Sequence, residues 1–198
     1  MTTSSLDPRA PLVLDTRELG RRPGTQREVT LTAPAPADLG IEVLAVPEGS
    51  PVELDLRLEA VMEGVLVTGT AHAALSGECV RCLEPITDPE RSTVEARFQE
   101  LYVYDDESQR HGRTADRQQD LDDETHRLEG DLLDLEPVLR DAVVLGLPFQ
   151  PLCSDDCPGL CVECGARLAD DPEHDHGEPV DPRWSKLAAL TQDRTDAD

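Results

Sequence analysis

The sequence predicts an α+β protein, with an N-terminal antiparallel β-sheet or partly closed barrel followed by a helix, a cysteine-rich zinc-knuckle loop and a short C-terminal helix. Three observations lead to this prediction. Apolar and polar residues alternate through most of the first hundred residues, apolar residues recur at helical spacing between residues 135 and 147, and the six cysteines fall into two short groups. Aromatic residues make up only 3% of the 198 residues, so the core must consist mainly of Val, Leu and Ala.

Residues 1–104 are expected to form the antiparallel β domain. The clearest strand covers residues 52–58, where Val and Leu alternate strictly with charged residues, as in a strand with one buried face. Glu63-Gly64 is a turn signal, and the alternation that resumes at Val65 predicts a hairpin. Other short apolar runs predict strands near residues 12–14, 29–31, 41–46 and 94–98.

The composition of the chain changes after this domain. Residues 105–130 are polar and acidic with few apolar side chains, which predicts a flexible insert. Residues 131–148 are expected to form a helix that packs on the sheet and stops at Pro148. Residues 149–198 are the cysteine-rich module, and Asp181 is expected to cap a short terminal helix.

The formal net charge of −24 predicts a soluble protein that repels phosphate backbones over most of its surface. No apolar run approaches the roughly 20 residues that a membrane helix needs. The N-terminal residues lack the cationic and apolar regions of a signal peptide, so we expect a cytoplasmic protein. Clustered cysteines in that compartment usually bind metal, because disulfides are disfavoured there.

Four cysteines within twelve residues predict a metal site. Zinc takes four tetrahedral ligands, and turns with two or three residues between cysteines can present two sulfur atoms to one ion. Gly165 directly follows the last cysteine, as in a zinc knuckle, where a small residue lets backbone amides turn toward the sulfur. We therefore expect one structural Zn²⁺ ion, held mainly by Cys153, Cys157, Cys161 and Cys164.

Two further pairs are secondary candidates for metal ligands. Cys79 and Cys82 are expected in a β-hairpin, where they could join Cys161 and Cys164 in a zinc ribbon, form a redox pair, or be buried structural thiols. His174 and His176 could each replace a thiolate as a ligand, or they could be a solvated pair in an acidic loop.

The chain does not resemble an enzyme in its local motifs. It contains no recognisable nucleophile motif, Gly-rich phosphate loop or His-Glu-x-x-His. We therefore expect no catalytic residues and no small-molecule substrate.

A local excess of arginine near the N-terminus is the candidate for partner binding. It contains Arg17, Arg21, Arg22 and Arg27, with Glu18 as the only acid among them. This cluster could contact RNA phosphates or a protein, or it could be a turn whose arginines pair with nearby acids.

Several of these segments together resemble the YceD family of bacterial and plastid proteins. The matching elements are Leu19 to Gly24, Cys79-Val-Arg-Cys82-Leu83-Glu84-Pro85, the helix that ends at Pro148, the cysteine run from Cys153 to Gly165, and Asp181-Pro182-Arg183-Trp184. The first of them is similar to actinobacterial members. The acidic insert lies outside the resemblance, and His174 and His176 stand where many members have cysteines.

The resemblance implies a role in the accumulation of large-subunit (23S) ribosomal RNA, without catalysis. The strong negative charge favours action through a basic partner, such as a large-subunit ribosomal protein or a pre-ribosomal particle. Direct RNA binding through the arginine cluster is the alternative, and a redox-sensitive zinc protein is a third, less favoured hypothesis.

Overall fold

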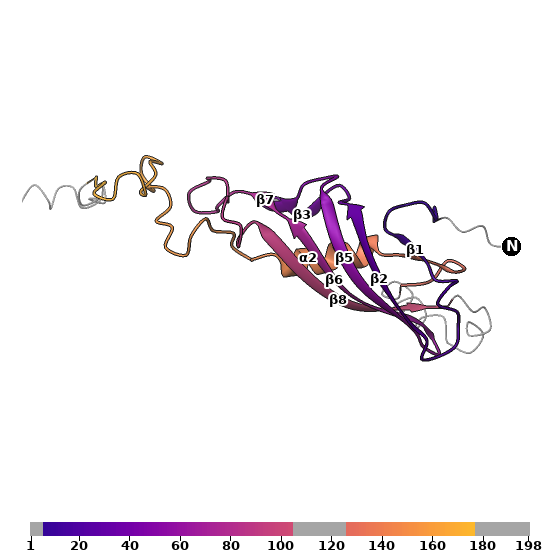
Figure 1. Cartoon of the computed structure of the whole chain (residues 1–198). Coiled ribbons are helices and arrows are strands. Elements are labelled where there is room, and N and C mark those ends of the chain that lie inside the picture. Colours follow the sequence, from indigo (N-terminus) through magenta and orange to yellow (C-terminus); the bar gives the residue numbers. More distant parts are fainter. Residues whose placement is uncertain (1–5, 105–125, 177–198) are drawn as a thin grey trace, which may run out of the picture. The chain divides into compact units, whose positions relative to one another are not determined.

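The alternation of apolar and charged residues gives β5 (Pro51–Ala60) one buried face and one exposed face. β5 lies in an antiparallel sheet with β2 (Gln26–Pro34), β6 (Gly64–Ala74) and β8 (Thr93–Val103), in the order β2-β5-β6-β8. Figure 1 shows these four long strands side by side. The described strands at the two edges, β2 and β8, do not pair with each other, so these four strands form an open antiparallel sheet and not a closed barrel.

The computed structural model describes residues 6–104 and 126–176. The chain divides into two compact units, Met1–Asp155 and Asp156–Asp198. Most of the predicted acidic insert and the predicted C-terminal helix at Asp181 lie outside the described residues.

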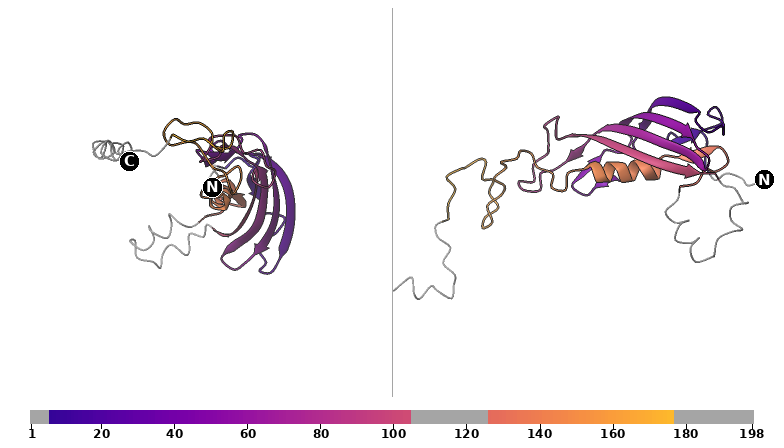
Figure 2. Two further views of the ribbon diagram at one scale, coloured as in Figure 1. Left: turned by 90° about the vertical axis from the view of Figure 1, so that its left-hand side faces the viewer. Right: turned by 90° about the horizontal axis from the view of Figure 1, so that it is seen from below.

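The helix α2 (Glu136–Gly146) covers one face of the sheet, which we call the inner face. Figure 2 shows the sheet curving around this helix. The helix packs against β8 and β3 through its buried residues Val138, Leu139, Ala142 and Val143. Pro137 stands in its first turn, and the helix ends before Pro148, as the sequence predicts. The segment 131–148 is not helical throughout, because it begins with the short strand β9 (Leu132–Asp134).

The strand β9 pairs with β1 (Val13–Asp15) and holds the N-terminal segment near α2. The Tyr102 hydroxyl of β8 donates a hydrogen bond of 2.7 Å to the Asp134 carbonyl oxygen. Residues 126–130, the end of the predicted insert, pack against the sheet: the Leu128 amide donates to the Val103 carbonyl, and Leu128 is buried. These residues therefore belong to the folded unit.

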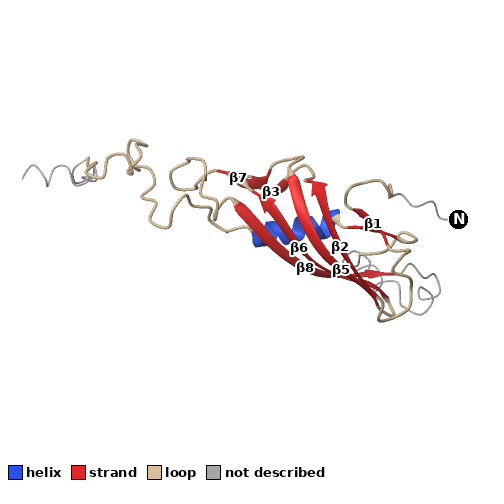
Figure 3. Cartoon of the chain, in the orientation of Figure 1, coloured by secondary structure: helices blue, strands red, loops and turns tan. Residues whose placement is uncertain are grey.

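A small third sheet contains β3 (Leu39–Ile41), β4 (Leu44–Val46) and β7 (Ser76–Gly77). The apolar run 41–46, expected as one strand, is the hairpin of β3 and β4, because Glu42 and Val43 form its turn and are exposed. Figure 3 shows β3 and β7 at one end of the long strands. The chain leaves β7 directly into the turn that contains Cys79 and Cys82.

Replacing Gly77 by Ala is expected to destabilise this end of the sheet. A Cβ atom at residue 77 would lie 2.2 Å from the Val43 carbonyl oxygen and 2.8 Å from the Leu44 Cα, so backbone must move. We expect a loss of about 1–3 kcal/mol in the free energy of unfolding, measured by urea denaturation. Gly146→Ala is the control, because its nearest atom would be at an ordinary 3.4 Å. An equal loss in both variants would contradict this packing.

Candidate metal centres

Two distant parts of the chain meet beyond β7. The Val80 amide donates a hydrogen bond of 3.0 Å to the carbonyl oxygen of Pro151, which follows α2. This contact places the Cys82 Sγ atom 3.6 Å from the Cys153 Sγ atom, although the two residues are 71 positions apart. The sheet and the segment after α2 therefore supply thiols to one location.

These thiols belong to a group of four cysteines. Its ligand atoms all lie within 4.8 Å of one another, and its members are Cys79, Cys82, Cys153 and Cys157. Cys153 is half-buried and the other three are buried. Four sulfur donors at this spacing match the set that zinc and other thiophilic metals take in closed structural sites. The group could therefore hold a metal ion.

The backbone around Cys79 and Cys82 forms a tight knuckle. The Leu83 amide donates to the Cys79 carbonyl oxygen at 2.9 Å, and the Cys79 amide donates to the Glu84 carbonyl oxygen at 2.8 Å. Leu83 has a φ angle of 60°, in the left-handed region that glycine favours. Because a leucine occupies the usual glycine position, the sequence does not reveal this turn as a knuckle.

Backbone amides also favour the charged form of the sulfur. Burial by itself raises the pKa of the Cys79 thiol, but hydrogen bonds from the backbone of Cys153, Cys82 and Arg81 outweigh it and lower the pKa to about 6. The thiolate is thus the main form at neutral pH. A thiolate is the form of cysteine that binds metal ions.

A second group lies wholly within the unit Asp156–Asp198. Its ligand atoms are also within 4.8 Å of one another, and its members are Cys161, Cys164, His174 and His176. The Cys164 Sγ atom lies 3.2 Å from Nε2 of His174 and 3.3 Å from Nε2 of His176. Hydrogen bonds from the backbone of Cys164 and Glu163 lower the pKa of Cys161 to about 6.

This arrangement differs from the grouping that the sequence predicts. The four C-terminal cysteines do not surround one centre, because Cys153 and Cys157 join the hairpin pair whereas Cys161 and Cys164 join the two histidines. Spacing along the chain indicates which residues could bind metal, but it does not show which distant pairs meet.

The arginine cluster near the N-terminus is largely paired with acids. Arg17 contacts Asp15, Arg27 lies 2.8 Å from Glu18, and Arg21 lies 3.4 Å from Asp131. The Arg21 guanidinium also lies over the Tyr104 ring, 4.7 Å from its centre. Arg22 is exposed in the turn before Gly24.

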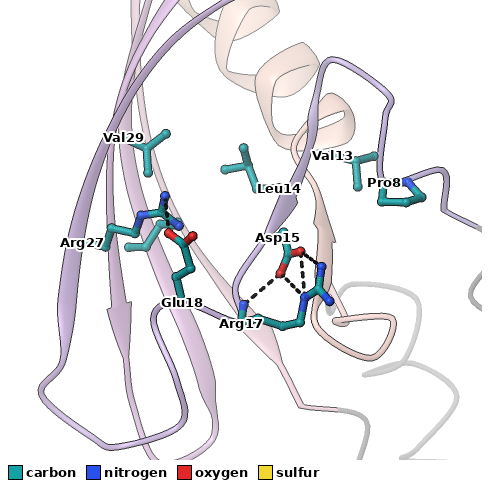
Figure 4. Close-up of a pocket in the computed structure, with 9 residues that line it drawn as sticks. Pro8, Val13, Leu14, Asp15, Arg17, Glu18, Arg27 and Val29 are labelled. Carbon is teal, nitrogen blue, oxygen red and sulfur yellow. Dashed lines mark hydrogen bonds and ion pairs between the residues drawn. The ribbon is translucent and has the colours of Figure 1, made fainter.

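Two of these arginines line a cavity of about 530 Å³ between β1 and β2. Figure 4 shows Arg17 and Arg27 at its wall beside their acidic partners, with the apolar side chains of Leu14 and Val29 nearby. The wall of the cavity therefore consists of ion pairs and apolar side chains. Because each of the two arginines is paired with an acid, the cavity is not a cationic binding site.

Comparison with known proteins identifies the family. A family model described as large ribosomal RNA subunit accumulation protein YceD matches residues 67–191, a range that contains every residue of both metal groups. The chain belongs to the YceD family. Its membership confirms the resemblance drawn from the cysteine and terminal motifs, and it associates the chain with large-subunit ribosomal RNA accumulation.

The YceD relatives include mycobacterial proteins of similar length. An uncharacterized protein of Mycobacterium tuberculosis (strain ATCC 25618 / H37Rv) is 43% identical over 187 residues, which cover 94% of this chain and 84% of the relative. An uncharacterized protein of Mycobacterium leprae is 39% identical over 181 residues, with 91% and 78% covered. No solved structure matches the chain. Within the described residues, none of the helices has the length and apolarity to cross a membrane.

Two substitutions at Leu83 test the knuckle of this YceD protein. Leu83→Gly should retain bound metal and leave stability unchanged or raise it by up to about 1 kcal/mol, because glycine adopts the left-handed conformation without steric cost. Leu83→Pro should lose metal, because proline fixes φ near −65° and removes the amide that donates to Cys79. Elemental analysis and urea denaturation of both purified variants measure these effects. Equal metal contents in the two variants would count against the knuckle.

Proposed function

We propose that the protein is a non-enzymatic ribosome-biogenesis factor that supports the synthesis, processing or stability of 23S ribosomal RNA through a basic protein partner. Membership of the YceD family supports the association with large-subunit ribosomal RNA. The partner in this proposal is a large-subunit ribosomal protein, either alone or in a pre-ribosomal particle. The choice of a protein over RNA rests on the distribution of charge.

The outer face of the four-stranded sheet, turned away from α2, is the proposed contact surface. Its charged side chains come from alternate positions of β2, β5 and β8, and they are Glu28, Glu53, Asp55, Arg57, Glu59, Glu95 and Arg97. Arg57 lies 3.1 Å from Glu59, and Arg97 lies 2.6 Å from Glu95. Both arginines are thus offset by acids, and the face retains a net negative charge. A negative surface attracts a basic partner and speeds its association.

The pairing of the N-terminal arginines is the observation that carries the choice of partner. Three of the four guanidinium groups lie beside the carboxylates of Asp15, Glu18 and Asp131. An RNA phosphate would have to displace these carboxylates and approach a chain whose formal charge is −24. A basic protein would not compete with these carboxylates for the arginines, and the negative charge of the chain would attract it.

Zinc is the proposed cofactor of the four-cysteine group. Its residues fit the ion, because four sulfur donors converge in a largely buried location and backbone hydrogen bonds favour the thiolate form of Cys79. Bound zinc would supply structural cross-linking in a segment with few apolar side chains. It would tie the hairpin at Cys79 and Cys82 to Cys153 after α2, and it would take no part in catalysis.

Removing negative charge from the outer face should weaken partner capture. We expect tagged wild-type protein to capture large-subunit ribosomal proteins from cells, with or without nuclease treatment. The triple variant Glu53→Gln, Asp55→Asn and Glu95→Gln should reduce this capture roughly tenfold at low salt, because the attraction between the faces is mainly electrostatic. Mass spectrometry of the captured proteins and sequencing of the captured RNA measure the effect.

Two controls separate the partner classes. The variant Glu42→Gln, Glu48→Gln and Glu90→Gln removes the same charge from exposed loops and should capture as well as wild type. Replacing Arg17, Arg21, Arg22 and Arg27 by Ala should preserve or strengthen capture of a basic protein. If nuclease and the arginine replacements each abolish capture, the protein binds RNA directly and the proposed partner is wrong.

A further inference from the structure

We propose that the chain holds a second zinc ion, separate from the four-cysteine group, in a site formed by Cys161, Cys164, His174 and His176. The sequence indicates one shared centre in this part of the chain, whereas the structure divides the donors into two sets. Each set offers four ligand atoms, which is the number that zinc takes in structural sites.

The separations of the donor atoms are close to, and slightly shorter than, the edges of a zinc tetrahedron. Zinc bonds of about 2.0–2.1 Å to nitrogen and 2.3 Å to sulfur place neighbouring ligand atoms about 3.3–3.8 Å apart. In the second group the Cys164 Sγ atom lies 3.2 Å and 3.3 Å from the two imidazole nitrogens, which are 2.9 Å from each other. The three atoms are slightly closer than a bound ion would hold them, and they converge on one centre.

A metal ion accounts for this triangle of atoms better than hydrogen bonding alone. Each of the three atoms can donate at most one proton, so hydrogen bonds serve all three edges only when both Nε2 atoms and the Cys164 sulfur are protonated. In a neutral imidazole whose Nδ1 carries the proton, Nε2 can only accept, and the edge between two such atoms brings lone pairs together. A cation at the common centre satisfies all of these lone pairs at once.

The second group also has the same backbone turn as the first. The Gly165 amide donates to the Cys161 carbonyl oxygen at 2.9 Å, and the Cys161 amide donates to the Ala166 carbonyl oxygen at 2.7 Å. Gly165 has a φ angle of 73°, in the left-handed region. These two bonds and this conformation match, position for position, those of the turn after Cys79. The part of the chain that the structure describes therefore contains two equivalent knuckles.

Both histidines present their outer ring nitrogens to carboxylates. Nδ1 of His174 lies 3.8 Å from the Asp171 Oδ2 atom, and Nδ1 of His176 lies 3.7 Å from the Glu163 Oε2 atom. Histidines that bind metal commonly pair their second nitrogen with a carboxylate, which fixes the tautomer and orients the ring. With Nε2 of each ring directed at Cys164, both imidazoles have the orientation that a metal ligand requires.

The two sites should differ in accessibility. The first group is largely buried beside the sheet, whereas Cys164 and His176 of the second are exposed. The second set comes from only sixteen consecutive residues, so its occupancy should not depend on the sheet. A competing chelator should therefore remove the second ion first.

Elemental analysis of the untagged full chain, purified under reducing conditions, tests the proposal. Wild type should contain two zinc ions, and His174→Ala with His176→Ala should contain one, with unchanged circular dichroism in the β region. Cys161→Ser with Cys164→Ser should give the same result. His72→Ala with His126→Ala removes two histidines outside the group and should retain two ions.

Cobalt substitution provides a second readout. The visible spectrum of the wild type should be the sum of a four-sulfur and a two-sulfur, two-nitrogen site, and the histidine variant should retain only the four-sulfur part. One ion in the wild type, two ions in the histidine variant, or a Cys161–Cys164 disulfide in place of the second ion would each overturn the proposal. Loss of this ion alone would leave the proposed partner and role untouched.

Discussion

The sulfur atoms of Cys82 and Cys153 lie 3.6 Å apart across 71 residues of sequence, and this contact governs how the segment after α2 returns to the sheet. A hydrogen bond between the two thiols, or one metal ion bound to both sulfur atoms, can hold this pair together. Backbone hydrogen bonds favour the thiolate form of the neighbouring Cys79, whose pKa they lower to about 6. The Val80 to Pro151 hydrogen bond positions the two segments so that a metal ion could bind both.

In this YceD protein, the groups that stabilise the fold are different from the charged residues that are proposed to bind a partner. A sheet built almost without aromatic side chains buries one face against α2 and leaves the other to charged residues. The proposed metal centres would stabilise segments that have few apolar residues. The outer face of the sheet then does not need apolar residues for stability and can carry negative charge. Three arginines that could otherwise bind RNA phosphates form ion pairs with Asp15, Glu18 and Asp131. These features together support the proposal that the protein recognises a basic protein and not RNA.

Local patterns predicted most of the strands but not the assembly of the site. The alternation at residues 52–58 and the helical spacing that ends before Pro148 identified β5 and α2, because each pattern depends on neighbours in sequence. The run 41–46 gave no sign of its turn, and a barrel could not be distinguished from an open sheet. Cysteine pairing depends on contacts between distant segments, and Leu83 in a left-handed conformation concealed the first knuckle.

Anomalous X-ray diffraction at the zinc edge from crystals of the full chain would show how many zinc ions the protein binds and which residues hold them. Two peaks are expected, one among the sulfur atoms of Cys79, Cys82, Cys153 and Cys157, and one among the donors of Cys161, Cys164, His174 and His176. A single peak shared by the four C-terminal cysteines, or the absence of any peak, would show that the protein does not hold two separate zinc ions in these groups.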